Sequence, residues 1–318
     1  MKRLTIVVPC YNEEEVFNDT NTALLGLLDE LKKKKKITST SGILYVDDGS
    51  KDNTWNLIEE AYKANSSIKA IKFAGNKGHQ NAVYAGLMFA KEYSDFTISI
   101  DADLQDDINV IEEMIDKYYD GAQVVYGVRN DRTTDSFFKR FTANSYYKLL
   151  KKNKSKAVFN SADFRLMSKE VINELEDYKE YHLFLRGLTP ELGFKQDQVF
   201  YARKKRLKGE SKYSLKKMIR LAFDGITSSN DTPLFSFFYI GGISLFVALL
   251  FLIQTIYIAF AYYAWDFYYS MFFLIFFFGG LILFGMAVLG QYAGRNLIES
   301  KKRPRYYIEK VLDKKGRK

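Results

Sequence analysis

The stretch Phe96–Asp106 reads FTISIDADLQD, and within it the chain changes from an apolar strand to a group of carboxylates. Residues 96–100 are typical of a buried strand, and Asp101 and Asp103 follow directly. On an extended backbone, side chains two residues apart point to the same side. Two carboxylates there offer hard oxygen ligands of the kind that Mg²⁺ or Mn²⁺ binds together with phosphate oxygens. A solvated turn is the alternative for an isolated D-x-D pattern, so the choice depends on the surrounding sequence.

Strand-like and helix-like segments alternate over the first 126 residues. The predicted strands cover residues 4–9, 43–46, 68–73, 96–100 and 124–126, and the predicted helices cover residues 13–32, 52–64, 79–92 and 109–119. This alternation predicts an α/β fold with an open, mostly parallel sheet and helices on both faces. Ligands of such sheets bind outside the carboxyl ends of the strands.

Polar residues follow four consecutive predicted strands at those ends. They are Tyr11-Asn12-Glu13, Asp47-Asp48, Asn76-Lys77, and Asp101 with Asp103. The first strand runs into Pro9-Cys10-Tyr11 rather than the glycine fingerprint of dinucleotide-binding sheets, and no P-loop pattern occurs. A metal-bridged diphosphate is therefore the expected ligand.

The charge balance points to anionic partners. The 318 residues contain 47 Lys and Arg against 38 Asp and Glu, which gives a net charge of +9. Nucleic acid, an anionic membrane or a phosphate substrate would suit this excess. We expect no nucleic-acid partner, because the excess gathers beside the apolar C-terminal segments. The single cysteine, Cys10, excludes an intrachain disulfide.

Two long apolar segments lie near the C-terminus. Residues 234–264 and 267–293 contain no charged side chain, and each exceeds the ~20 residues of a membrane-spanning helix. A buried hairpin in a soluble fold is the alternative. Lys and Arg flank the outer ends, whereas the Trp265-Asp266 turn has none, so the positive-inside rule predicts a multi-pass plasma-membrane protein with a cytoplasmic catalytic domain.

The predicted domain boundaries follow from these segments. Residues 1–210 form the catalytic domain, 211–232 an amphipathic basic helix at the membrane interface, 233–294 the transmembrane hairpin, and 295–318 a basic cytoplasmic tail.

Six short motifs resemble those of a known family. They are VVPCYNE (7–13), VDDGS (46–50), NKGHQNA (76–82) with Gly86, DADLQD (101–106), ADFRLM (162–167) and GESKY (209–213). In this order, with two C-terminal apolar helices, they resemble family 2 glycosyltransferases of the GT-A fold that act on polyprenyl phosphates, relatives of dolichol-phosphate mannose and glucose synthases. The His79-Gln80 variant is more similar to bacterial enzymes that charge undecaprenyl phosphate.

The resemblance implies inverting, metal-dependent transfer of one sugar from a nucleotide diphosphate sugar to a polyprenyl phosphate, which would yield a lipid-linked donor for cell-envelope glycosylation. UDP-glucose and UDP-N-acetylglucosamine are the leading donors. The resemblance implies that the donor is bound by two sets of residues: the nucleoside by Pro9, Tyr11, Glu13 and Asp48, and the rest of the donor by Lys77, Ala102, Arg206 and Lys212, with Gln105 facing the sugar. It implies that Asp101 and Asp103 bind the Mg²⁺ or Mn²⁺ ion and that Arg129 and Arg140 bind the acceptor phosphate. Asp163 and Asp103 are the residues that it implies in catalysis.

Several alternatives stay open. Asp163 is expected to orient the acceptor, or to form a salt bridge with a local arginine instead. A processive polysaccharide synthase would share the D-x-D motif, but neither Trp55 nor Trp265 completes its Q-x-x-R-W motif. A non-catalytic, membrane-anchored protein that binds anionic lipid is a further alternative. Homo-oligomerisation through the aromatic helices is compatible with the sequence.

Overall fold

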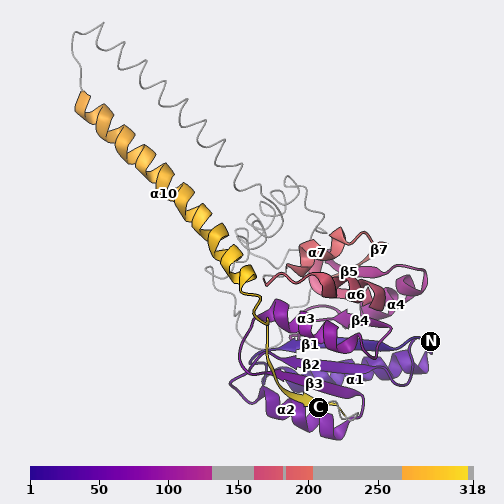
Figure 1. Ribbon diagram of the computed structural model, residues 1–318. Helices are drawn as coiled ribbons and strands as arrows, with labels where there is room; N and C mark the ends of the chain where they lie inside the picture. The colour runs from indigo at the N-terminus through magenta and orange to yellow at the C-terminus, as the bar shows by residue number, and fades with distance from the viewer. Residues whose placement is uncertain (131–160, 182–183, 203–266, 314–318) are drawn as a thin grey trace. The chain divides into compact units, whose positions relative to one another are not determined.

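The computed structural model describes residues 1–130, 161–181, 184–202 and 267–313 (Figure 1). The chain divides into two compact units. One combines Met1–Gly225 with Pro304–Lys318, and the other is Ile226–Arg303.

The first unit is built on one eight-stranded sheet with the order β7-β5-β6-β4-β1-β2-β3-β8. Its strands are β1 (Leu4–Cys10), β2 (Gly42–Asp47), β3 (Ile68–Phe73), β4 (Phe96–Ser99), β5 (Val124–Arg129), β6 (Ser161–Ser168), β7 (Gln196–Tyr201) and β8 (Ile308–Leu312). The central strands β4, β1, β2 and β3 are parallel, whereas β6 and β8 run antiparallel to their neighbours. The predicted mostly parallel α/β sheet is therefore confirmed.

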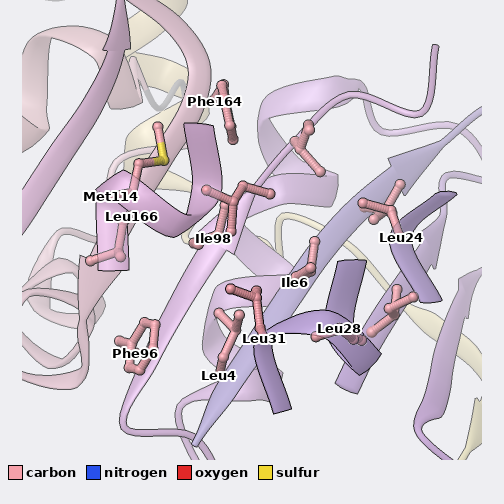
Figure 2. Packing of buried hydrophobic residues seen from close by; sticks show 14 of the residues in the cluster. Leu4, Ile6, Leu24, Leu28, Leu31, Phe96, Ile98, Met114, Phe164 and Leu166 are labelled. Atoms are coloured by element: carbon pink, nitrogen blue, oxygen red, sulfur yellow. The ribbon is translucent and has the colours of Figure 1, made fainter. Parts of the chain in front are cut away.

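Helices cover both faces of this sheet, as predicted. The helices are α1 (Phe17–Lys33), α2 (Thr54–Ala64), α3 (His79–Ala90), the 3-10 helix η1 (Ile108–Val110), α4 (Ile111–Tyr119), α6 (Lys169–Asp177) and α7 (Leu185–Glu191). One apolar cluster packs α1, α2 and α4 on one face, and Figure 2 shows part of it around Leu4, Leu28 and Phe96. A second cluster packs α3, α6 and α7 on the other face. Burial of both faces explains why β1 and β2 are apolar along nearly their whole length.

Helix α3 lies unusually close to the sheet. A Cβ atom added at Gly86 would be 2.3 Å from Val7 Cγ1 and 2.9 Å from Val46 Cγ2. Only glycine allows this approach, because any side chain would overlap with β1 and β2. This close approach also sets the position of His79, the first residue of α3.

Some predicted boundaries were wrong. Helix α1 begins at Phe17, and Glu13–Glu15 form a turn before it rather than its first turn. Strand β4 ends at Ser99, so Asp101 and Asp103 lie in a turn and not on extended backbone. Strands β7 and β8 were not predicted, and β8 lies inside the segment predicted as a basic tail.

In the second unit, the second apolar segment forms the single helix α10 (Phe267–Ser300). Among the residues that the structure describes, we find no helix with both the length and the apolar character needed to cross a membrane. The first apolar segment and the predicted amphipathic helix lie outside the described residues, so the predicted hairpin and domain boundaries stay predictions.

Candidate active site

The D-x-D motif forms a tight turn at the carboxyl end of β4. The Ala102 carbonyl accepts a 2.6 Å hydrogen bond from Thr20 Oγ1, and Asp103 Oδ1 accepts one of 3.1 Å from the backbone N–H of Gln105. Leu104, which lies between Asp103 and Gln105, adopts a left-handed backbone conformation with a φ of 51°. This conformation is costly for a side chain such as leucine and concentrates at functional sites. A strained turn thus presents both carboxylates.

Strand β6 brings Asp163 to the same place. It pairs with β4 in antiparallel register, with Phe96 opposite Ser168 and Ser99 opposite Arg165. Continued by two residues, this register places Asp163 opposite Asp101. Ser99 Oγ donates a 2.6 Å hydrogen bond to the Asp163 carbonyl and holds the two chain segments together. The ADFRLM motif thus lies on a strand, and the antiparallel pairing of that strand with β4 was not predicted.

The buried Asp163 carboxylate accepts hydrogen bonds on both oxygens. Oδ1 accepts from Arg165 Nη2 at 2.8 Å and from Arg186 Nε at 3.0 Å. Oδ2 accepts from Arg186 Nη2 at 2.9 Å and from Gln80 Nε2 at 3.2 Å. Burial favours the neutral acid, but Arg186, His79 and Arg165 outweigh it and hold the pKa of Asp163 well below its ordinary value. Asp163 is therefore an ionised carboxylate at the centre of a cluster of cationic side chains, here called the Asp163 hub. This arrangement matches the salt-bridge alternative.

His79 links this hub to the D-x-D turn. Its Nε2 atom lies 3.4 Å from Asp163 Oδ2 and 3.5 Å from Asp101 Oδ1. Burial lowers the pKa of His79, but the two carboxylates outweigh it and raise the pKa to about 9. Burial, together with the negative charges of Asp106, Asp103 and Asp163, raises the pKa of Asp101 to about 6 despite His79. The turn is thus crowded with negative charge, which a bound cation would relieve.

On the other side of the site, Asp48 organises the loop before α3. Its Oδ1 accepts from the Lys77 N–H at 2.6 Å and its Oδ2 from the Gly78 N–H at 2.9 Å. Burial raises the pKa of Asp48, and these two backbone donors only partly oppose that shift. Lys77 itself is exposed. Asp48 therefore shapes the loop that leads to His79.

The ends of β1 and β2 are tied together beside Asp48. The Asn12 N–H donates to Ser50 Oγ at 3.0 Å, and the Glu13 N–H donates to Thr54 Oγ1 at 2.8 Å. Asn12 has a φ of 53°, a second left-handed residue at this edge of the sheet. The predicted polar cluster at this sheet edge is thus confirmed, while the nucleoside roles of Pro9, Tyr11, Glu13 and Asp48 stay predictions.

Arg129, which was predicted to bind the acceptor phosphate, contacts the last residue of the DADLQD motif. At the end of β5, its Nη2 donates to the buried Asp106 Oδ1 at 3.0 Å, and Tyr201 donates to the same oxygen at 2.5 Å. These attractions raise the pKa of Arg129 above its ordinary value even though burial opposes them. Its role toward the acceptor stays a prediction.

Arg140, Arg206 and Lys212 lie outside the described residues. His79, Gln80, Arg165, Arg186 and Tyr201 were not predicted as members of the site. The NKGHQNA motif was an available signal for the first two, and the ADFRLM motif for Arg165, whereas Arg186 in α7 and Tyr201 in β7 have no comparable motif. Within the described part of the chain, no group of three or more His, Cys, Asp or Glu side chains is arranged to hold a metal ion.

Comparisons with known proteins agree with this geometry. Residues 5–176, more than half of the chain, match the model of glycosyl transferase family 2. The chain belongs to that family. It is 47% identical over 306 residues to the uncharacterized glycosyltransferase YkoT of Bacillus subtilis (strain 168), covering 96% of this chain and 91% of that protein. The chain is therefore a glycosyltransferase.

Other relatives are named for their lipid acceptor. The chain is 37% identical to the prophage bactoprenol glucosyl transferase homolog of Escherichia coli (strain K12), covering 97% of this chain and 99% of that protein. It is 38% identical to the bactoprenol glucosyl transferase of Shigella phage SfV, covering 98% and 100% respectively. The predicted family and type of enzyme are thus confirmed.

Proposed function

We propose that this glycosyltransferase moves one sugar, with inversion, from a UDP-sugar to undecaprenyl or another polyprenyl phosphate. The observation that supports it best is the juxtaposition of the D-x-D turn with the Asp163 hub in a chain that aligns end to end with bactoprenol glucosyl transferases. UDP-glucose is the first donor to test, because those relatives are named glucosyl transferases, and UDP-N-acetylglucosamine is the second.

We further propose that Asp101 and Asp103 hold a Mg²⁺ or Mn²⁺ ion. The donor set fits, because these ions take one or two carboxylates and complete their shell with phosphate oxygens. The raised pKa of Asp101, about 6, reflects burial and the adjacent carboxylates, and a divalent cation would offset that crowding. When bound, the ion would neutralise charge that develops on the departing diphosphate.

The residues of the chain supply the remaining functions. Asp48 holds the loop of Lys77 and Gly78 in place, and His79, which follows this loop, reaches Asp101 of the D-x-D turn. The acceptor is a phosphate monoester with a second pKa of ~6, which is largely dianionic at pH 7. It needs cations to orient it more than it needs a strong base. Arg186, which pairs with Asp163 opposite Asp101, provides such charge.

A transfer assay tests the proposal. Purified full-length protein would be given labelled UDP-glucose or UDP-N-acetylglucosamine with a short polyprenyl phosphate. We expect one sugar per lipid, loss of activity in excess chelator, and loss of activity in Asp103→Asn. A ladder of products would favour the processive synthase, and the absence of transfer with any donor would favour the lipid-binding alternative. Full activity in excess chelator would exclude the metal.

Membrane attachment through residues 233–294 is part of the proposal. Its basis is the two charge-free segments and the Lys and Arg that flank them. Cysteine labelling in intact cells tests it, after replacement of the buried Cys10. A cysteine at position 266 should react from outside and one at position 318 should not. The reverse pattern would contradict a cytoplasmic catalytic domain.

A further inference from the structure

The Asp163 carboxylate has little capacity for further contacts. Each of its oxygens accepts two hydrogen bonds, from Arg165, Arg186 and Gln80. An ionised carboxylate offers about four acceptor positions, so these bonds occupy them all. Its negative charge would also repel a phosphate. The geometry therefore argues against Asp163 as the group that removes a proton or touches the acceptor phosphate.

Arg186 is the more exposed of the two arginines that contact Asp163. Its side chain is 32% exposed, against 8% for Asp163 and 2% for Arg165. It grips Asp163 through Nε and Nη2, a bidentate pairing that sets the plane of the guanidinium. Asp163 thus holds an arginine that is partly exposed.

Arg165 holds the other end of this arrangement. Its Nη1 donates to the Leu185 carbonyl at 2.9 Å and to Thr189 Oγ1 at 3.2 Å, while its Nη2 donates to Asp163. The start of α7, where Arg186 lies, is therefore tied to β6 through a buried cation. Two guanidinium groups, those of Arg165 and Arg186, thus donate to the single Asp163 carboxylate.

The location of this arginine relates it to the reaction. Asp163 lies opposite Asp101 in the continued register of β4 and β6, and His79 touches both carboxylates. Arg186 thus contacts Asp163 directly, and Asp163 lies opposite Asp101, which is proposed to face the donor diphosphate. A nucleophile that attacks the sugar must lie beside the donor, so a cation here is placed to bind it.

We propose that Arg186 contacts the acceptor phosphate and that Asp163 is a positioning residue that holds Arg186 in place. This inference rests on the proposed function and names a residue for its acceptor. A phosphate dianion and a guanidinium can share two parallel hydrogen bonds, which lysine cannot reproduce.

The test compares kinetic constants of the full-length protein with UDP-glucose and a short polyprenyl phosphate. Arg186→Gln should raise the KM of the acceptor roughly ten- to hundredfold, as expected for a lost charged hydrogen bond, and change the KM of the donor less than about twofold. The acceptor KM of Arg186→Lys should lie between that of Arg186→Gln and that of the parent protein. Lys117→Gln is the matched control, because it removes an ion-paired cation 3.1 Å from Asp197, at the opposite end of the strands.

A second measurement separates charge recognition from folding. Farnesyl phosphate should inhibit the parent protein far better than farnesol, and Arg186→Gln should lose most of that preference. A variant that raises only the donor KM, or keeps the full preference for farnesyl phosphate, would overturn the assignment while the proposed function stands. If the parent transfers no sugar to any polyprenyl phosphate, the proposed function fails, and this inference fails with it.

Discussion

Asp48 and Asp163 are two buried aspartates on the two sides of the site, with side chains in opposite electrostatic environments. Asp48 accepts from two neutral backbone N–H groups, and burial raises its pKa. Asp163 accepts from two guanidinium groups, which lower its pKa well below the ordinary value although burial opposes them. The same residue type in similarly buried positions is thus tuned by the charge of its donors.

This difference separates two roles. Asp48 shapes a loop through neutral hydrogen bonds, whereas Asp163 neutralises and orients cations that belong to β6 and α7. The charged donors of Asp163 make it expensive to remove, because its loss leaves Arg165 buried without a counter-ion.

The largest effect is expected from removing the charge of each aspartate. Asp163→Asn should lower the free energy of unfolding by about 3–5 kcal/mol, the usual cost of leaving a buried charge unpaired. Asp48→Asn should cost about 1–3 kcal/mol, because one hydrogen bond to a backbone N–H is lost. Denaturant unfolding of both variants measures the difference. Equal losses would show that the charge of the donors does not matter.

The next largest effect concerns α3, which joins the two sides. Gly86→Ala should cost about 1–3 kcal/mol, because the new methyl group overlaps with Val7 and Val46. Gly26→Ala is the matched control, since nothing lies within 4 Å of a Cβ there and the residue is in the middle of α1. That variant should be stabilised by up to about 1 kcal/mol. A stable Gly86→Ala protein would mean that α3 moves easily.

The pH dependence of stability should differ between the two aspartates. Asp163 has a lowered pKa, so it contributes stability above its ordinary value of 3.8, and this is lost as the pH falls through its folded pKa. Asp48 has a raised pKa, so its contribution is present below 3.8 and is lost as the pH rises through its folded pKa. Below pH ~4, stability of the parent should therefore fall more steeply than that of Asp163→Asn, by up to about 1.4 kcal/mol per pH unit. Parallel curves would contradict the lowered pKa.

The smallest effect is expected just before the C-terminal strand β8, on the Asp48 side. Tyr306 stacks on Phe73 with ring centroids 4.9 Å apart, and the Tyr307 carbonyl accepts from the Ala74 N–H at 3.0 Å, just before the loop that Asp48 holds. Tyr306→Leu should cost about 1 kcal/mol. The exposed Tyr307→Leu should stay within about 0.5 kcal/mol in thermal unfolding. Equal costs would show that the stacking does not support this edge.

Local pattern was sufficient to predict the central sheet. Strand β3 was predicted with the observed bounds, and β1, β2, β4 and the helices between them were predicted to within a few residues. These elements are adjacent in sequence and buried on both faces, so continuous apolar runs identify them. The D-x-D turn and the loop before α3 follow these strands directly, and the sequence analysis therefore located them.

The tertiary structure decided the surroundings of Asp163. Its pairing with Arg186 joins residues 23 positions apart, and its position opposite Asp101 depends on β6 inserting antiparallel between β4 and β5. Strand β8 pairs with β3 from more than 230 positions away along the chain. The family, the central strands and the carboxylates of the D-x-D motif could be predicted from the local order of residues. Which cations meet Asp163 was decided only by the fold, because electrostatic contacts depend on distance in space, and no local pattern records it.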